Sequence, residues 1–274
     1  MNRDSVQVHI SDTHCGGLTA LFPDYPMTFK YDEKNILSYT PTEDQKEMYR
    51  HLIKCADEVK RIGIGKRIQV TVNGDVIEGA HHNTIQIISP KPNHHTEIFI
   101  EVFDAFLDRI GYSVNNGDEL HFISGTESHT GWEEYGISRH YEVFGAQYHD
   151  ELKKEINGRE IWWTHQGARP GKGVNEGNAH RNWMRDIYYD CIKQNKKPPH
   201  LIVNSHYHKA HHGIYNDSYN HTIHGIILPS WQKKTRFGQR AAPFERNDIG
   251  LNITEVTAEG DLRIHKPLLM ENNE

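Results

Sequence analysis

Strand-like runs that end on Asp or His recur along this sequence, and they constrain the fold more than any other feature. The first is residues 6–16 (VQVHISDTHCG), in which apolar residues alternate up to Ile10 and are followed by Asp12 and His14. Alternation with a period of two predicts a β-strand that delivers both side chains at its end. Later runs end in the same way, at Asp75, in the loop 125–129 (GTESH), at His165, and at His206 with His208.

Helical periodicity separates these runs. We expect helices at about 40–62, 96–110, 133–145 and 178–194, and the first one has Thr40 as N-cap, Pro41 at N1 and Glu43 at N3. Strands are expected at 6–10, 67–72, 119–124, 159–164 and 200–204, and in the tail at 222–228, 251–256 and 262–266.

Alternating strands and helices up to residue 205, followed by an all-strand tail, predict an α/β fold: a four-layer-type sandwich of two mixed β-sheets flanked by helices. We expect a single domain over residues 1–274, with a long loop insertion at about 16–40 and a C-terminal β-rich tail at about 222–268. Loops at the carboxyl ends of strands in open α/β sheets gather into one crevice. The Asp and His side chains are therefore expected to converge.

Charge, cysteine content and hydropathy limit the partners and the compartment that we expect for this protein. The net charge is −6 at pH 7, so no global basic field favours long duplex DNA. The 3 cysteines are far apart, without a CxxC pair or a disulfide framework. The first residues lack the apolar core of a signal peptide, and no apolar run reaches the ~18 residues of a membrane span. A cytoplasmic protein without a membrane partner is expected.

The ligand-bearing strand ends also resemble a known family. In type and order, Asp12-x-His14, Gly74-Asp75, the Gly-rich loop with a following His, His165-x-Gly and His206-x-His208 resemble the motifs of the calcineurin-like metallophosphoesterases. The resemblance spans residues 6–210. It implies a centre of two divalent metal ions, one bound by Asp12, His14 and His208 and the other by His165, His206 and a residue of the loop 125–129, with Asp75 bridging them.

Mixed nitrogen and oxygen ligands favour Mn²⁺ as the metal, with Zn²⁺, Fe or Ni²⁺ as alternatives, over Mg²⁺ or Ca²⁺. The third motif departs from the family. Family members usually have Gly-Asn-His-Asp/Glu there, whereas this chain has GTESH and lacks the Asn. Glu127 or His129 could replace it as a ligand, and His129 could instead be the general acid.

Substrate contacts are expected outside the metal centre. The candidates are His82 in the loop after Asp75, Arg169 and Lys172 in the glycine-rich segment 168–177, and Lys233 and Arg236 in the segment 230–246. This last segment (SWQKKTRFGQRAAPFER) mixes basic residues with Trp231, Phe237 and Phe244, a combination that can hold a phosphate backbone and stack on bases. His94 and His95 are expected on the surface.

The predicted activity is that of a metal-dependent phosphoric ester hydrolase. We expect a phosphodiesterase or nuclease that hydrolyses nucleic acid or nucleotide diesters with a metal-bridged hydroxide, the two metals stabilising the charge on phosphorus. One alternative is a phosphomonoesterase acting on a nucleotide, a protein or a small metabolite. Another, of a different class, is a catalytically inactive binding scaffold, for which the missing Asn is the only support.

Overall fold

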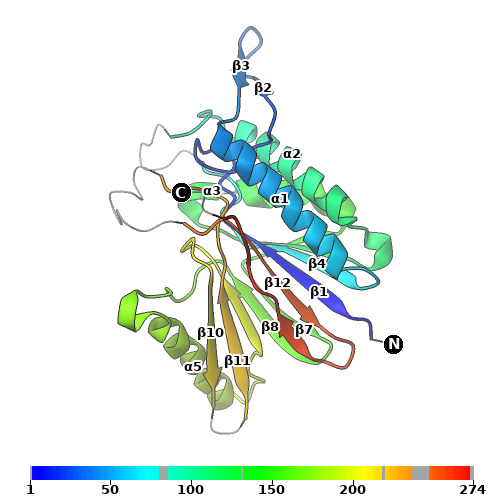
Figure 1. The fold of residues 1–274 in the computed structure, drawn as a ribbon, viewed down its shortest axis with the longest axis vertical. Helices are drawn as coiled ribbons and strands as arrows, with labels where there is room; N and C mark the ends of the chain where they lie inside the picture. The colour runs from blue at the N-terminus through cyan, green and yellow to red at the C-terminus, as the bar shows by residue number, and fades with distance from the viewer. Residues whose placement is uncertain (1, 80–85, 131, 218–219, 236–246, 272–274) are drawn as a thin grey trace.

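Two mixed β-sheets lie face to face with helices on their outer sides (Figure 1). This computed structural model describes residues 2–79, 86–130, 132–217, 220–235 and 247–271. The first sheet has the order β13-β12-β1-β4-β5-β6, with β14 paired to β12, and the second has the order β10-β11-β9-β8-β7. The predicted sandwich of two mixed sheets is confirmed.

The strands of the first sheet are β1 (Ser5–Ile10), β4 (Arg67–Val72), β5 (Glu119–Ile123), β6 (Ala146–His149), β12 (Gly250–Val256), β13 (Leu262–Ile264) and β14 (Leu268–Leu269). Those of the second sheet are β7 (Glu151–Ile156), β8 (Arg159–Thr164), β9 (Leu201–Asn204), β10 (His211–Asn216) and β11 (Thr222–Ile227). The α-helices are α1 (Glu43–Ile62), α2 (Pro92–Ile110), α3 (Glu127–Thr130), α4 (Glu133–His140) and α5 (Asn178–Lys193), and the 3-10 helices are η1 (Val114–Asn116), η2 (Tyr141–Phe144) and η3 (Gly173–Asn175).

Three groups of buried side chains hold the layers together. The largest lies between the first sheet and helices α1 and α2, and it includes Val8 of β1, Leu52 of α1 and Phe103 of α2. A second lies between the two sheets and includes Trp163 of β8 and Val256 of β12. The third lies under α5, on the outer face of the second sheet. Both faces of the central strand β1 are buried, and its apolar Val6, Val8 and Ile10 alternate with the polar Gln7 and His9.

Parallel pairing sets where the strand ends meet. Strand β1 runs parallel to β4, and β4 runs parallel to β5, so the residues that follow these three strands emerge at one edge of the first sheet. Strand β8 runs parallel to β9, which brings the residues after them together at the edge of the second sheet. The expected crevice forms where these two edges meet.

Several expected elements differ from the structure. Residues 16–40 are not a continuous loop, because β2 (Met27–Lys30) and β3 (Ile36–Tyr39) form a hairpin whose turn is closed by backbone N–H groups donating to Asp32 Oδ1. The N-cap of α1 is Thr42 with Gln45 at N3, two residues later than the predicted cap. The tail is divided between the sheets, since β11 joins the second sheet and β12 the first.

Among the described residues, no helix is both long and apolar enough to cross a lipid bilayer.

Candidate metal centre

Unusual backbone geometry marks the strand ends. The residues Asp12, His14, Asp75, His206 and His208 all have positive φ angles, between 45° and 74°. The other non-glycine residues with positive φ in the described chain are Asn157, Asn195 and Asn220, and asparagine tolerates this region best. Left-handed Asp and His residues are strained, and such strain is retained mainly at functional sites. All five are residues that the sequence predicts as metal ligands.

Asp12, His14 and His208 form the first group of potential ligands. Asp12 Oδ1 lies 3.3 Å from His208 Nε2 and 3.9 Å from His14 Nε2. The other carboxylate oxygen, Oδ2, accepts hydrogen bonds from Ser11 Oγ at 2.5 Å and from the His206 backbone N–H at 3.3 Å. Asp12 Oδ1 is buried, and its nearest partners among the described residues are these two imidazole nitrogens. A buried carboxylate oxygen that faces two imidazoles fits a divalent cation bound by all three side chains.

Asp75, His165 and His206 form the second group. Asp75 Oδ2 lies 3.1 Å from His165 Nε2 and 3.9 Å from His206 Nδ1. His165 is oriented from behind, because its Nδ1 atom lies 2.7 Å from the backbone oxygen of Asn73 and so donates to it. This hydrogen bond leaves Nε2 as the ligand atom, the arrangement found in metal-binding histidines.

Ser205, the residue before His206, supports the same histidine. Its hydroxyl accepts a hydrogen bond from Asn73 Nδ2 at 2.8 Å and donates to the Asn73 backbone oxygen at 2.8 Å. The side chain is fully buried beside His165. The serine thus fixes the Asn73 backbone oxygen to which His165 donates. It leaves His206 and His208 in the ligand groups.

Within the second group, the acidic and basic side chains shift each other's pKa values in opposite directions. Burial alone would raise the pKa of Asp75, but the hydrogen bond and positive charge of His165 outweigh it and hold the pKa well below its usual range. Burial would likewise lower the pKa of His165, yet Asp75 raises it to about 10. A carboxylate surrounded by imidazoles in a buried pocket is a donor set suited to a divalent ion of the Mn²⁺ or Zn²⁺ type.

Glu78 is a site residue that the sequence reasoning missed. Its carboxylate Oε2 lies 3.0 Å from His14 Nδ1 and accepts a hydrogen bond from Gln232 Nε2 at 2.6 Å. Although burial opposes it, this contact with Glu78 raises the pKa of His14 to about 9. An acidic residue three positions after Asp75 (GDVIE) was the available signal, because the loop that carries Asp75 also carries Glu78 past the tip of β1.

The loop 125–129 enters the centre through residues other than Glu127. Glu127 is exposed at the start of α3 and belongs to none of the ligand groups formed by the described residues. His129 lies beside the first group: its ring centroid is 4.9 Å from that of His14, and its Nδ1 atom lies 3.2 Å from the Glu78 backbone oxygen. Thr126, which was not predicted, contacts the second group directly.

Buried Glu134 holds this loop against the Asp75 loop. Its carboxylate accepts hydrogen bonds from the backbone N–H of Gly125 at 2.6 Å and of Val76 at 3.1 Å. Burial, with the nearby charge of Asp75, raises the pKa of Glu134 to about 7. A side chain at Gly125 would clash, since its Cβ would lie 2.3 Å from the Asp75 backbone nitrogen. The close approach of the two loops therefore requires glycine there.

Two of the predicted substrate contacts line a cleft next to the second group. Arg169 and Lys172 border a cleft of about 630 Å³ together with His206, Tyr207 and Lys209. The Arg169 guanidinium lies 5.9 Å from the centroid of the Tyr207 ring. Because His206 also belongs to the second ligand group, the cleft and the candidate metal centre are continuous.

The other predicted contacts are placed differently. Lys233 forms an ion pair with Asp44 of α1 at 2.8 Å, while His82 and Arg236 lie outside the described residues. Trp231 is wholly buried, so its ring cannot stack on a base, and its backbone N–H donates to the backbone oxygen of Asp12 at 2.9 Å. His94 and His95 are buried, not on the surface. His95 packs on Gly16, donates from Nε2 to the Ser89 backbone oxygen at 2.7 Å and accepts at Nδ1 from the Gly79 N–H at 3.3 Å.

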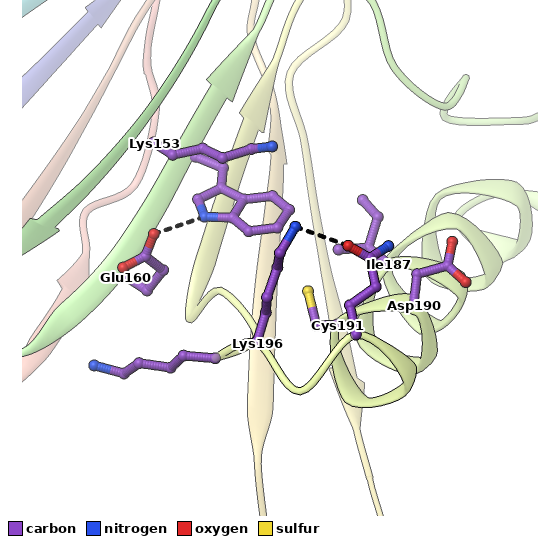
Figure 2. A pocket seen from close by; sticks show the side chains of 9 residues that line it. Lys153, Glu160, Ile187, Asp190, Cys191 and Lys196 are labelled. Carbon is purple, nitrogen blue, oxygen red and sulfur yellow. Dashed lines mark hydrogen bonds between the residues drawn. The ribbon is translucent and has the colours of Figure 1, made fainter.

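A second pocket lies apart from these residues, between α5 and strands β7 and β8 (Figure 2). It has a volume of about 540 Å³ and is lined by Lys153, Trp162, Cys191 and Lys196, among others. In Figure 2 the Trp162 indole donates to Glu160, with 2.9 Å between Nε1 and Oε1. None of the predicted ligands lines it.

No protein-family model and no curated protein sequence matches this chain. Solved structures with a similar fold include a novel archaeal phosphodiesterase (TM-score 0.44, 10% identity, 97% of this chain and 99% of that one). Another is the NAD nucleotidase of Haemophilus influenzae, with a TM-score of 0.41 and 9% identity over 96% of this chain and 49% of that one. A third is a predicted phosphoesterase from Streptococcus pneumoniae, with a TM-score of 0.36 and 11% identity over 97% of this chain and 100% of that one. The chain thus spans about half the length of the nucleotidase.

The predicted sandwich of two mixed sheets is present, and its ligand-bearing strand ends come together in the two groups described above.

Proposed function

We propose that this protein is a metal-dependent phosphoesterase that holds two divalent ions. Asp12, His14 and His208 would bind one ion, and Asp75, His165 and His206 the other. The observation that carries the proposal is the convergence of two such groups, each with its ligand atoms within 4.8 Å of one another, at neighbouring strand ends. Asp75 is the proposed bridging ligand, because its backbone oxygen accepts a hydrogen bond from the His14 N–H at 3.0 Å while its carboxylate belongs to the second group. Mn²⁺ is the ion we propose.

Two bound ions would supply Lewis-acid charge to the phosphoryl group and lower the pKa of nearby water. The protein's own residues orient the ligands and supply a proton. Glu78 orients His14, and the Asn73 backbone orients His165, so both rings present Nε2 to the centre. His129 lies against His14 and is the proposed general acid that protonates the leaving oxygen.

The cleft beside His206 supports a phosphodiester as the substrate. A monoester needs only the phosphoryl site, whereas a nucleotide diester extends beyond it and carries further polar groups. Arg169, Lys172 and Lys209 offer positive charge along the cleft, and Tyr207 offers an aromatic face. Lys209 is partly neutralised by Asp248, at 3.7 Å. We therefore propose a nucleotide or short single-stranded nucleic acid as the substrate class, since the net charge of −6 disfavours long duplexes.

A comparison of two chromogenic esters tests this proposal. With Mn²⁺ present, we expect a higher kcat/KM for bis-p-nitrophenyl phosphate than for p-nitrophenyl phosphate. A strong preference for the monoester would replace the diesterase by a monoesterase. Hydrolysis of neither ester, together with an absence of bound Mn²⁺, would instead indicate a binding scaffold without activity.

A further inference from the structure

We propose that the hydroxyl of Thr126 is the fourth protein ligand of the ion held by Asp75, His165 and His206. The inference rests on the proposed function, because it concerns one of the two ions named there. It assigns to a neutral hydroxyl the role that the sequence suggested for Glu127 or His129.

The Thr126 hydroxyl touches every ligand atom of the second group. Its Oγ1 atom lies 3.2 Å from Asp75 Oδ2, 3.3 Å from His165 Nε2 and 3.3 Å from His206 Nδ1. Metal–nitrogen and metal–oxygen bonds of about 2.1 Å place neighbouring ligand atoms about 3.0 to 3.4 Å apart, depending on the geometry. The hydroxyl oxygen is therefore spaced from the other three atoms as a member of the same coordination shell would be.

The backbone fixes this position independently of the hydroxyl. The Thr126 N–H donates to Asp75 Oδ1 at 2.6 Å, and the preceding Gly125 N–H donates to Glu134 Oε2 at 2.6 Å. Since both contacts are made by the main chain, they persist whatever side chain stands at position 126. Threonine is also β-branched, so its side chain has few rotamers and holds the hydroxyl toward the centre.

The two other candidates of the loop do not belong to the second group. Glu127 is exposed, and His129 belongs with His14 and Glu78 on the side of the first ion. A ligand from this loop to the second ion is thus supplied by the residue directly after Gly125, which is also where the family motif places its asparagine. The chain thus places a hydroxyl oxygen at the sequence position where that motif has an amide oxygen.

Metal titration of position-126 variants tests the assignment. Metal-stripped protein would be titrated with Mn²⁺ by calorimetry, and with Co²⁺ while the visible absorption of the ion is recorded. Thr126→Val removes the hydroxyl at nearly constant volume, Thr126→Ser keeps it, and Thr126→Asn offers an amide oxygen. Thr71→Val is the matched control, because Thr71 is a fully buried threonine of β4 outside both ligand groups.

We expect wild type, Thr126→Ser and Thr71→Val to bind two equivalents alike. Thr126→Val should bind the second equivalent about 10- to 100-fold more weakly, the loss typical when a partner of a metal site is removed, and should change the Co²⁺ spectrum. An unchanged second affinity and spectrum in Thr126→Val would overturn the ligand role and leave the proposed function intact. Failure of the wild type to bind metal would overturn the proposed function itself. If Thr126→Val does not fold, a Co²⁺ spectrum unaltered in Thr126→Asn would equally refute the assignment.

Discussion

His14 Nδ1 lies 3.0 Å from Glu78 Oε2, and both side chains are buried. The segment after β1 supplies the histidine and the loop after β4 the glutamate, so the contact joins the ends of two neighbouring strands. A carboxylate behind a histidine fixes the ring and makes its other nitrogen a better ligand. Gln232 holds the same carboxylate oxygen from the opposite side.

Glu78→Gln should therefore weaken metal binding without removing a ligand. The amide has no charge to polarise His14, so we expect the affinity for the ion held by Asp12, His14 and His208 to fall by about 10- to 100-fold. Calorimetric titration of the metal-stripped protein measures this. Glu160→Gln, a change in the pocket of Figure 2, is the control and should bind as the wild type does. Equal affinities for all three proteins would refute the role of Glu78.

Arg169→Ala and Lys172→Ala should impair substrate binding and spare the metal centre. Each side chain is exposed at the cleft beside His206. An exposed charge contact contributes up to about 1 kcal/mol, so each change should raise KM for a dinucleotide about fivefold. The effect should shrink at high salt, because the contact is screened.

Steady-state kinetics at two salt concentrations, together with the Mn²⁺ content, separate these effects. Lys196→Ala removes a cation from the second pocket and should leave KM unchanged. A KM that does not move in either cleft variant would place the substrate elsewhere.

His9 should make folding stability sensitive to pH. It is buried between the sheets, where Trp163 Nε1 donates to its Nδ1 at 3.1 Å, so that nitrogen carries no proton. Burial lowers the pKa of His9 from 6.5 to about 3. Between these values the unfolded chain binds a proton that the folded chain does not, so stability falls as the pH falls below about 6.5.

The expected loss at pH 5, relative to neutral pH, is about 2 kcal/mol from this residue. Urea unfolding of metal-free wild type and His9→Gln at pH 5 and 7.5 measures it. The variant should be less stable at pH 7.5 but should show a smaller difference between the two pH values. His140→Gln, a change at an exposed histidine, should keep the wild-type pH dependence. An identical pH dependence in His9→Gln would exclude His9 as its source.

Central strands and amphipathic helices could be predicted from the sequence because burial imposes a visible pattern. The Ile-Trp-Trp segment within residues 159–164 predicted β8 with its observed bounds. Edge strands leave a weaker pattern. In β7 (ELKKEI) only Leu152 and Ile156 are buried, and the residues between them are charged. Its pairing with β8 stabilises it, and that pairing is invisible in the local sequence.

The candidate site likewise contains residues that the sequence pattern predicted and residues that it missed. Asp12, His14, Asp75, His165, His206 and His208 were identifiable because Asp and His at strand ends have few structural roles. Glu78 and Thr126 were missed since their roles depend on which loops touch. Glutamate and threonine are also common in loops, so neither residue type attracts attention by itself.

The most direct test of the account is the rate of bis-p-nitrophenyl phosphate hydrolysis as Mn²⁺ is titrated into metal-stripped protein. We predict no hydrolysis without metal and a rate that saturates at two equivalents. Asp75→Asn should lower that rate by about 100-fold or more, since it removes the bridging charge. Undiminished hydrolysis in excess chelator, or a wild-type rate in Asp75→Asn, would contradict the account.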